Sequence, residues 1–291
     1  MAVSGASPAR AAQGGAGYTA GTGAGPAHRP RPHEILAAGY FALTGLFVVA
    51  YGSPMSVWWD ALLLRAALIA LCLAGLPRLP DRGAWRLLRD WLPPIGLVYV
   101  YAEVGRLNDL FTEGYHDAAI LRLEAGVFGT QPSVVLRELF PWKPLSEYLH
   151  LAYFSYYALG PAYAGSLYLQ RRYAAYRYSL TVMLAIFFVC YLAFVMVPVA
   201  GPWYVFARPS PDEMGWLFPH VEHAVLASAA TVGAAFPSSH VAAALGLWLL
   251  AWRLSRPVFR VFAFFVPALI VGTVYGGFHY GVDALAGIVA A

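Results

Sequence analysis

The sequence predicts an all-α membrane protein, a polytopic bundle of transmembrane helices. Of its 291 residues, 60% are hydrophobic and only 12% are charged, and the mean hydropathy is +0.59. Water-soluble domains of this length do not have such a composition. From Ile35 onward the chain offers repeated apolar runs of about the 20 residues that a helix needs to cross a bilayer. These observations exclude a soluble enzyme domain.

Hydropathy over a window of roughly 19 residues predicts eight membrane spans. The third opens with Pro93 and Pro94, which is tolerated near the end of a span. The first 34 residues are rich in Ala, Gly and Pro and lack an apolar segment of signal-peptide length. We expect this stretch, 1–34, to be a disordered cytoplasmic tail. The spans lie near residues 35–52, 58–76, 91–105, 145–169, 178–199, 238–254 and 258–275, with an eighth beginning near Asp283.

The charges predict which side of the membrane each connection faces. With a cytoplasmic N-terminus, most of the nineteen basic residues fall on inner segments, whereas the outer segments hold many of the acids. This asymmetry follows the positive-inside rule. Cys72 and Cys190 fall within apolar spans, so we expect buried thiols and no disulfide. The sequence predicts a multi-pass protein of the cell membrane.

Two motifs contain the residues that we expect to do chemistry. The first is Phe236-Pro-Ser-Ser-His240, and the second is Tyr275-Gly-Gly-Phe-His279-Tyr-Gly-Val-Asp283. His240 opens the sixth span, and the other two ionisable residues lie between the seventh and eighth spans. Span parity therefore places all three on the outer face, where they predict one shared site.

The first motif is typical of a helix start. Serine hydroxyls such as those of Ser238 and Ser239 satisfy the free N–H groups of a first helical turn. The same N–H groups, with the positive end of the helix dipole, favour a phosphate beside His240. Taken alone, plain capping of a membrane helix is the commoner explanation of this motif.

The second motif predicts an activated histidine. His279 and Asp283 are four residues apart, so on a helix the carboxylate could accept the Nδ1 proton and leave Nε2 free. Such a histidine could attack phosphorus, while His240 protonates the departing alkoxide and later deprotonates an acceptor hydroxyl. A structural pair or a proton path is the alternative, although ionisable residues inside membranes are functional by default.

The remaining polar groups give weaker signals. The stretch from Tyr115 to Gly129 is predicted to be an interfacial helix, or else an ordinary amphipathic connector. His220 and His223 have no further clustered ligand, so we expect no metal site. The tyrosines between 153 and 163 are irregularly spaced and could line a polar cavity or belong to packing and the interfacial belt; we favour packing. No cofactor and no nucleic-acid partner are expected, lipids are the expected substrates, and the oligomeric state stays open.

Taken together, the two motifs resemble those of the type 2 phosphatidic acid phosphatase superfamily. The phosphatases of that superfamily have a lysine and Arg-Pro in a first motif, Pro-Ser-Gly-His in a second, and Ser-Arg five residues before the final His-x-x-x-Asp. This chain departs from the pattern at several places. It has Arg208-Pro209, but Gly201 stands where the lysine should be, Ser239 replaces glycine, and Gly272-Thr273 replaces Ser-Arg.

With these departures, the chain resembles the branch of the superfamily that contains the inositol phosphorylceramide synthases. The hallmarks of that branch are a Phe-Pro-Ser-x-His motif, a Tyr-x-x-x-His-Tyr-x-x-Asp motif and a Pro-rich stretch, which is Pro198-Val-Ala-Gly-Pro-Trp-Tyr204 here. The segment from Asp117 to Pro132, including Glu124, is also similar. The resemblance covers roughly residues 100–291.

The resemblance implies a six-helix catalytic core over residues 91–291, preceded by two accessory helices in 35–80. It implies His279 as nucleophile, Asp283 as its orienting partner, and His240 as acid and then base. Ser238, Ser239, Arg208 and Tyr275 are candidate phosphate ligands. Since the chain stops at Ala291, we expect the last span to be truncated.

The expected function is a phosphotransferase that moves a phosphorylated headgroup, similar to inositol phosphate, from a phospholipid to a lipid alcohol through a phosphohistidine. A lipid phosphate or prenyl diphosphate phosphatase is the first alternative, because it would differ only in using water as the acceptor. A transporter or structural membrane protein is the second.

Overall fold

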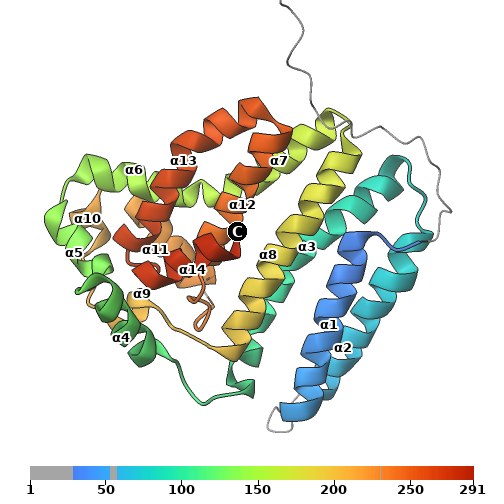
Figure 1. Cartoon of the computed structure of the whole chain (residues 1–291), viewed down its shortest axis with the longest axis horizontal. Helices are drawn as coiled ribbons and strands as arrows, with labels where there is room; N and C mark the ends of the chain where they lie inside the picture. Colours follow the sequence, from blue (N-terminus) through green and yellow to red (C-terminus); the bar gives the residue numbers. More distant parts are fainter. Residues whose placement is uncertain (1–28, 53–57, 230) are drawn as a thin grey trace, which may run out of the picture.

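The computed structural model describes residues 29–52, 58–229 and 231–291 (Figure 1). These residues form fourteen α-helices with short 3-10 and π turns between some of them, and they contain no strand, only an isolated bridge between Val199 and Ala234. The prediction of an all-α polytopic bundle is therefore confirmed. The predicted tail, 1–34, lies mostly outside the described residues, and its last three residues already belong to the first helix.

Three helices form the N-terminal part. They are α1 (Pro32–Tyr51), α2 (Trp58–Ala70), which continues through a π turn and a 3-10 turn to Arg78, and α3 (Gly83–Leu107). The third helix is longer than predicted and continues through Pro93 and Pro94 instead of beginning there. A proline at position 94 cannot donate to the carbonyl of Asp90 four residues earlier. The hydroxyl of Tyr176 donates to that oxygen instead, at 2.9 Å, so the helix continues without an unsatisfied acceptor.

The other predicted spans also correspond to helices, with one interruption. The span predicted at 145–169 is divided at Ser155 into two helices. The helices of this part are α4 (Asp117–Phe128), α5 (Pro132–Leu139), α6 (Lys143–Phe154), α7 (Tyr156–Leu169), α8 (Tyr173–Met196), α9 (Pro202–Val205), α10 (Pro211–Met214), α11 (Phe218–Ala229), α12 (Ser239–Leu254), α13 (Arg256–Tyr275) and α14 (Gly281–Ala290). Among the described residues, four helical segments are long and apolar enough to cross a membrane: 32–51, 58–78, 173–196 and 256–275.

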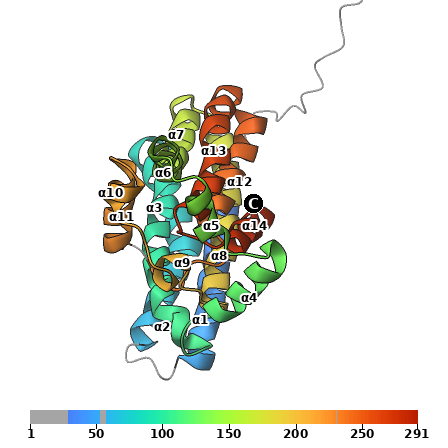
Figure 2. The same cartoon turned by 90° about the vertical axis from the view of Figure 1, so that its left-hand side faces the viewer.

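Helix α8 lies at the centre of the bundle, with α12 against one side and α1 and α3 against the other (Figure 1). The ring of Tyr40 from α1 stacks on Phe188 of α8, with 4.3 Å between centroids. In the perpendicular view, α10 and α11 lie on one side of the bundle and α4 on the other (Figure 2). The segments that carry both histidine motifs therefore lie between α4 and α11.

A buried ion pair fastens the three N-terminal helices to one another. Arg65 of α2 and Glu103 of α3 are 2% and 5% exposed and pair at 3.0 Å. Thr44 of α1 accepts a further hydrogen bond from the same guanidinium at 3.1 Å. Charged groups in an apolar interior are tolerated only when they are paired in this way. The pair thus joins three helices.

We expect Arg65→Leu to destabilise the protein by about 3–5 kcal/mol, because the substitution leaves the Glu103 carboxylate buried without its partner. Thermal unfolding in detergent would measure the loss. The double variant Arg65→Leu/Glu103→Leu should recover most of it, since no unpaired charge remains. Arg253→Leu, at an exposed position, is the control. A double variant as unstable as the single one would contradict this account.

Candidate active site

The site is formed by three segments that lie far apart in the sequence. The loop after α8 and the loop before α12 run side by side, because the Val199 N–H donates to Gly233 O at 3.2 Å and the Ala235 N–H donates to Val199 O at 3.1 Å. The turn between α13 and α14 closes the site from the third side. His240 comes from the second segment and His279 from the third.

A main-chain carbonyl determines which ring nitrogen of His279 carries a hydrogen. Its Nδ1 lies 2.8 Å from the oxygen of Ala235. A carbonyl oxygen can only accept a hydrogen bond, so Nδ1 carries a proton, and in the neutral imidazole Nε2 has the free electron pair. His279 is 4% exposed, so this pair points into a largely dry interior. The imidazole is thereby held in the tautomer that a nucleophile at Nε2 requires.

Asp283 is close to His279 but does not form the hydrogen bond expected from the sequence. Its Oδ2 lies 3.6 Å from Nδ1 of His279 and instead accepts the Tyr280 N–H at 2.8 Å, within the first turn of α14. The main-chain oxygen of Asp283 accepts the Ser238 N–H at 2.9 Å and so ties α14 to the start of α12. The residue positions the two motifs relative to one another and supplies charge near His279.

His240 faces the free nitrogen of His279. Its Nδ1 lies 3.4 Å from Nε2 of His279, and the two ring centroids are 5.6 Å apart. Because Nε2 of His279 is an acceptor, Nδ1 of His240 is the donor in this contact. The proton of His240 therefore points to the place where a phosphorus atom bound to His279 would lie.

The start of α12 offers donors beside this pair. Ser238 caps the helix, since its Oγ accepts the Val241 N–H at 3.4 Å. The N–H groups of Ser239 and His240 donate to no protein group in the described part of the chain. At the start of α14, by contrast, the first three N–H groups all bond to carboxylates. Of the two helix starts, α12 is therefore the one with N–H groups free to bind an anion.

Helix α4 holds the site together through two buried acids, which the sequence analysis did not identify as site residues. Asp117 accepts the N–H groups of Ala200 and Gly201, both at 2.8 Å. Glu124, two turns further along, accepts the N–H groups of Gly281 and Val282, both at 3.0 Å. The predicted connector helix thus turns its acids inward, and exposes Leu123 and Val127 instead.

Close packing occupies the positions at which the phosphatase pattern has cations. Gly201 has φ +95°, and a Cβ there would lie 3.1 Å from the Cβ of Ala235. A Cβ on Gly272 would lie 2.5 Å from the carbonyl oxygen of Leu149. Thr273 is fully buried, and its carbonyl accepts the N–H groups of Phe278 and His279. A serine at position 272 would require the backbone to move, and a lysine at position 201 would adopt a strained φ and press on the Cβ of Ala235.

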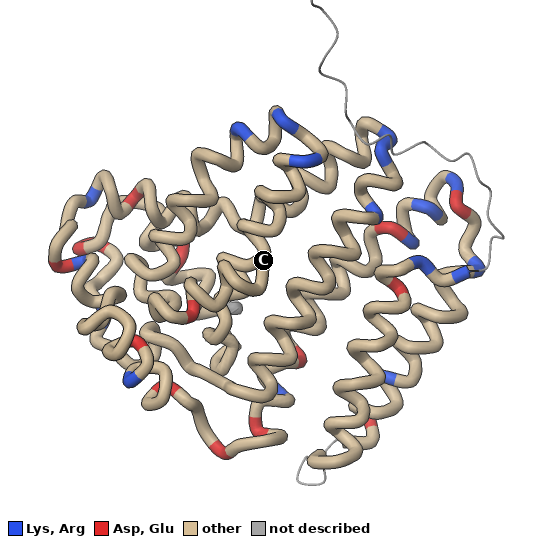
Figure 3. The backbone as a smooth tube through the Cα atoms, viewed as in Figure 1, with Lys and Arg blue, Asp and Glu red and all other residues tan. Residues whose placement is uncertain are grey.

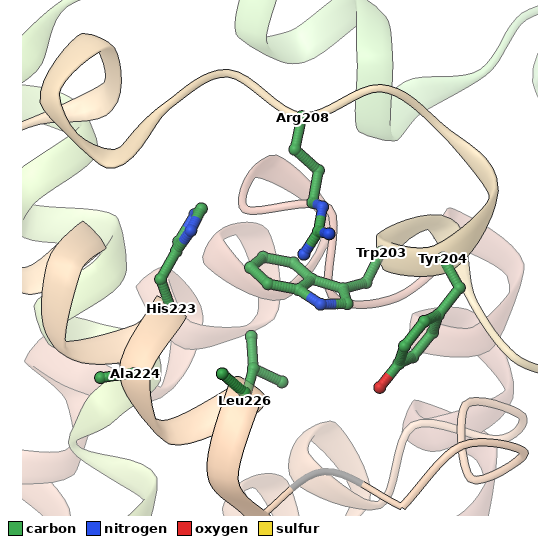
Figure 4. A pocket seen from close by; sticks show the side chains of 7 residues that line it. Trp203, Tyr204, Arg208, His223, Ala224 and Leu226 are labelled. Carbon is green, nitrogen blue, oxygen red and sulfur yellow. The ribbon is translucent and has the colours of Figure 1, made fainter.

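The last two candidate phosphate ligands lie apart from the histidine pair. Tyr275 donates its hydroxyl to Phe140 O at 2.9 Å, so that group is already engaged. Arg208 lies over the ring of Trp203, 4.1 Å from its centroid, in a pocket of about 590 Å³ (Figure 4). The pocket is lined by Trp203, Tyr204, Arg208, His223, Ala224, Leu226 and Ala227.

Aromatic rings connect this pocket to the histidines. Trp203 packs against Phe278, which precedes His279, with 5.8 Å between centroids. Burial lowers the pKa of His223 to about 4, so its imidazole is neutral and Arg208 is the cation of the pocket. His220, the other half of the rejected metal pair, bonds to Asp212 at 3.0 Å. The pocket thus borders the site and has a positive charge.

The comparison with protein families agrees with this geometry. The family model of the PAP2 superfamily matches residues 118–291, and the chain therefore belongs to that superfamily. Members of the superfamily are generally enzymes, either phosphatases or phosphotransferases. Neither a curated protein nor a solved structure matches it.

We expect Glu124→Ala to loosen the turn before α14, because the N–H groups of Gly281 and Val282 lose their acceptors at a cost of about 1–3 kcal/mol each. Hydrogen exchange of the peptide that contains residues 280–283 should become faster. The exposed acid Glu138 of α5 provides the control variant, Glu138→Ala. Unchanged exchange in Glu124→Ala would show that this acid does not hold the turn.

Proposed function

We propose that the protein is a membrane phosphotransferase that moves a phosphorylated headgroup from a phospholipid to a lipid alcohol through a phosphohistidine at His279. The observation that carries this proposal is the contact between Nε2 of His279 and Nδ1 of His240, beside the two unengaged N–H groups of α12. A nucleophile, a proton donor and an anion site therefore meet at one point.

In the first half of the reaction, Nε2 of His279 attacks the phosphorus of the donor lipid. The P–N bond forms as the bond from phosphorus to the lipid oxygen breaks, and Nδ1 of His240 gives its proton to that oxygen. The two rings separate when the phosphate enters, since their nitrogens are only 3.4 Å apart without it. The hydrogen bond from Nδ1 of His279 to Ala235 keeps the nucleophile in place.

In the second half, Nδ1 of His240 accepts the proton of an acceptor hydroxyl. The oxygen attacks phosphorus, the P–N bond breaks, and His279 returns to its first state. With an alcohol the product is a new phosphodiester, and with water it is a free phosphate ester. Gly201 and Thr273, which stand at the lysine and arginine positions of the phosphatase pattern, support the first outcome, because two of the cations that hold a dianionic phosphate in the phosphatases are replaced here.

The pocket beside Trp203 supports a role in binding the headgroup. Arg208 provides a charge there, and the aromatic contact with Phe278 brings the pocket next to the histidine. Figure 3 shows most lysines and arginines along one edge of the bundle and many acids near the opposite edge. By the positive-inside rule this distribution supports a site on the outer face of the cell membrane.

His279→Gln should abolish formation of the phosphoenzyme, because the amide cannot attack phosphorus. The measurement is trapping of an acid-labile, base-stable phosphoprotein from a radiolabelled phospholipid. His220→Gln, which changes an exposed histidine, should retain the label. Equal labelling of His279→Gln and the wild type would refute a phosphohistidine at this position.

The acceptor can be identified with the same labelled donor. Wild-type protein given a lipid alcohol should form a labelled phosphodiester, and it should release little free phosphate ester when the alcohol is absent. Release of the phosphate ester at the same rate with and without the alcohol would show that the enzyme is a hydrolase.

Arg208→Gln should raise KM for the donor lipid by about 10–100-fold and change kcat much less, because a charge-assisted hydrogen bond contributes about 1.5–3 kcal/mol. Steady-state kinetics in mixed micelles would measure both constants. The matched control is Arg122→Gln, at an exposed position of α4. An unchanged KM would remove Arg208 from the headgroup site.

A further inference from the structure

His240 has a second polar neighbour. The hydroxyl of Tyr153, on α6, lies 3.4 Å from Nε2 of His240, and the two ring centroids are 5.0 Å apart. Tyr153 is 2% exposed, and its ring stacks on Phe278 with 4.2 Å between centroids. Tyr153 is thus held beside Nε2 of His240, the nitrogen that does not contact His279.

The direction of this contact follows from the protonation of His279. Nδ1 of His240 donates to His279, so in the neutral imidazole Nε2 is an acceptor. The hydroxyl of Tyr153 is therefore the donor. One chain of hydrogen bonds runs from Tyr153 through His240 and His279 to the carbonyl of Ala235, with every proton pointing the same way.

A neutral His240 cannot give up its Nδ1 proton unless Nε2 receives another, because the product would be an imidazolate. A cationic His240 would avoid the difficulty but would place a charge in a largely apolar interior, which is costly. Neither an imidazolate nor a buried imidazolium forms if a group that donates to Nε2 gives its proton to His240 and is itself reprotonated by a nearby acid. Tyr153 occupies that place.

Glu222 is an acid without a visible use. It is fully buried, and neither carboxyl oxygen has a hydrogen-bond partner in the described part of the chain. Positions 218, 222 and 226 share one face of α11. On that face Phe218 packs against Phe154, and Leu226 packs against the cluster of Tyr153, Trp203 and Phe278. Glu222 lies between them and faces α6.

Helix α11 is held firmly in this position. The carboxylate of Glu147, on α6, accepts the N–H groups of Trp216, Leu217 and Phe218 at the start of α11. Burial raises the pKa of Glu222 to about 8, so its carboxyl group carries a proton at neutral pH. A protonated acid without a hydrogen-bond partner is thereby kept on the face of α11 that packs against the cluster containing Tyr153.

We propose that Glu222 and Tyr153 form a proton relay to His240. The proposal rests on the function proposed above. As the Nδ1 proton of His240 moves to the lipid oxygen, the phenol proton moves to Nε2. The carboxyl proton of Glu222 moves to the phenol oxygen once these two groups, which are not hydrogen-bonded in this structure, come into contact. Glu222 is left as a carboxylate and stores the negative charge that would otherwise remain on the alkoxide. The acceptor hydroxyl reverses each transfer in the second half.

The test compares two donors. An alkyl phosphodiester has a leaving oxygen that needs a proton, whereas an aryl phosphodiester such as a p-nitrophenyl ester leaves as an anion. Tyr153→Phe and Glu222→Gln should each slow phosphorylation of His279 by the alkyl donor about 10²-fold or more, the usual contribution of general acid catalysis. Both should react normally with the aryl donor.

Two control variants accompany them. Tyr148→Phe removes another hydroxyl of α6, one that bonds to Phe264 O, and Glu213→Gln changes an exposed acid. Both should behave as the wild type with either donor. The double variant Tyr153→Phe/Glu222→Gln should be no slower than either single one, since both residues belong to one relay.

The relay also predicts a pH dependence. The titratable groups near Glu222 are Tyr153 of α6 and Tyr157 of α7, and those that face His240 are Tyr153, Tyr156 of α7 and His279. Above about pH 8 Glu222 loses the proton that it must supply, so the rate with the alkyl donor should fall. The rate with the aryl donor should show no such fall.

Each outcome decides between the proposals. Unchanged rates of Tyr153→Phe and Glu222→Gln with the alkyl donor would overturn the relay while the phosphohistidine remains. Equal slowing with both donors would also overturn it, because a purely structural defect does not depend on the leaving group. If the wild type forms no phosphohistidine, the proposed function fails and the relay fails with it.

Discussion

The hydrogen bond between Nδ1 of His279 and the carbonyl oxygen of Ala235 determines the chemistry of the site. A carbonyl has no proton to give, so one nitrogen of His279 is a donor and the other must be an acceptor. The same logic then sets the roles of both nitrogens of His240 and of the Tyr153 hydroxyl. A neutral, directional array results, and no residue in it has to carry a charge before substrate binds.

That carbonyl is placed by residues outside the two histidine motifs. The strand-like bridge from Val199 to Ala234 fixes its loop, and Asp117 holds the neighbouring backbone through two N–H groups. Glu124 does the same for the turn after His279. Helix α4 therefore links the two loops. Its carboxylates face inward because they accept the main-chain N–H groups of these loops.

The sequence predicted those site residues that act through their side chains and belong to a recognisable motif. The motifs around His240 and His279 predicted a meeting of both imidazoles, and the structure places them within 3.4 Å. The partner of Nδ1 could not be predicted, because a main-chain oxygen leaves no mark in a sequence. Asp283 was assigned that role from its spacing, but the N–H of Tyr280 competes for its carboxylate. Tyr153 was assigned to packing because its neighbouring tyrosines follow no helical period.

The fold was easier to predict than the site, since hydropathy and charge determine where helices run. The continuation of α3 through Pro93 and Pro94 was not predicted, because it depends on Tyr176, a partner far away in the sequence. Gly272 shows how far such packing reaches. Gly272 lets α13 approach the backbone of α6 at Leu149. Leu149 lies four residues before Tyr153 on α6, and Gly272 lies seven residues before His279. The close approach of the two backbones at this point therefore sets the separation between His279 and Tyr153, and any side chain larger than hydrogen at position 272 would increase it.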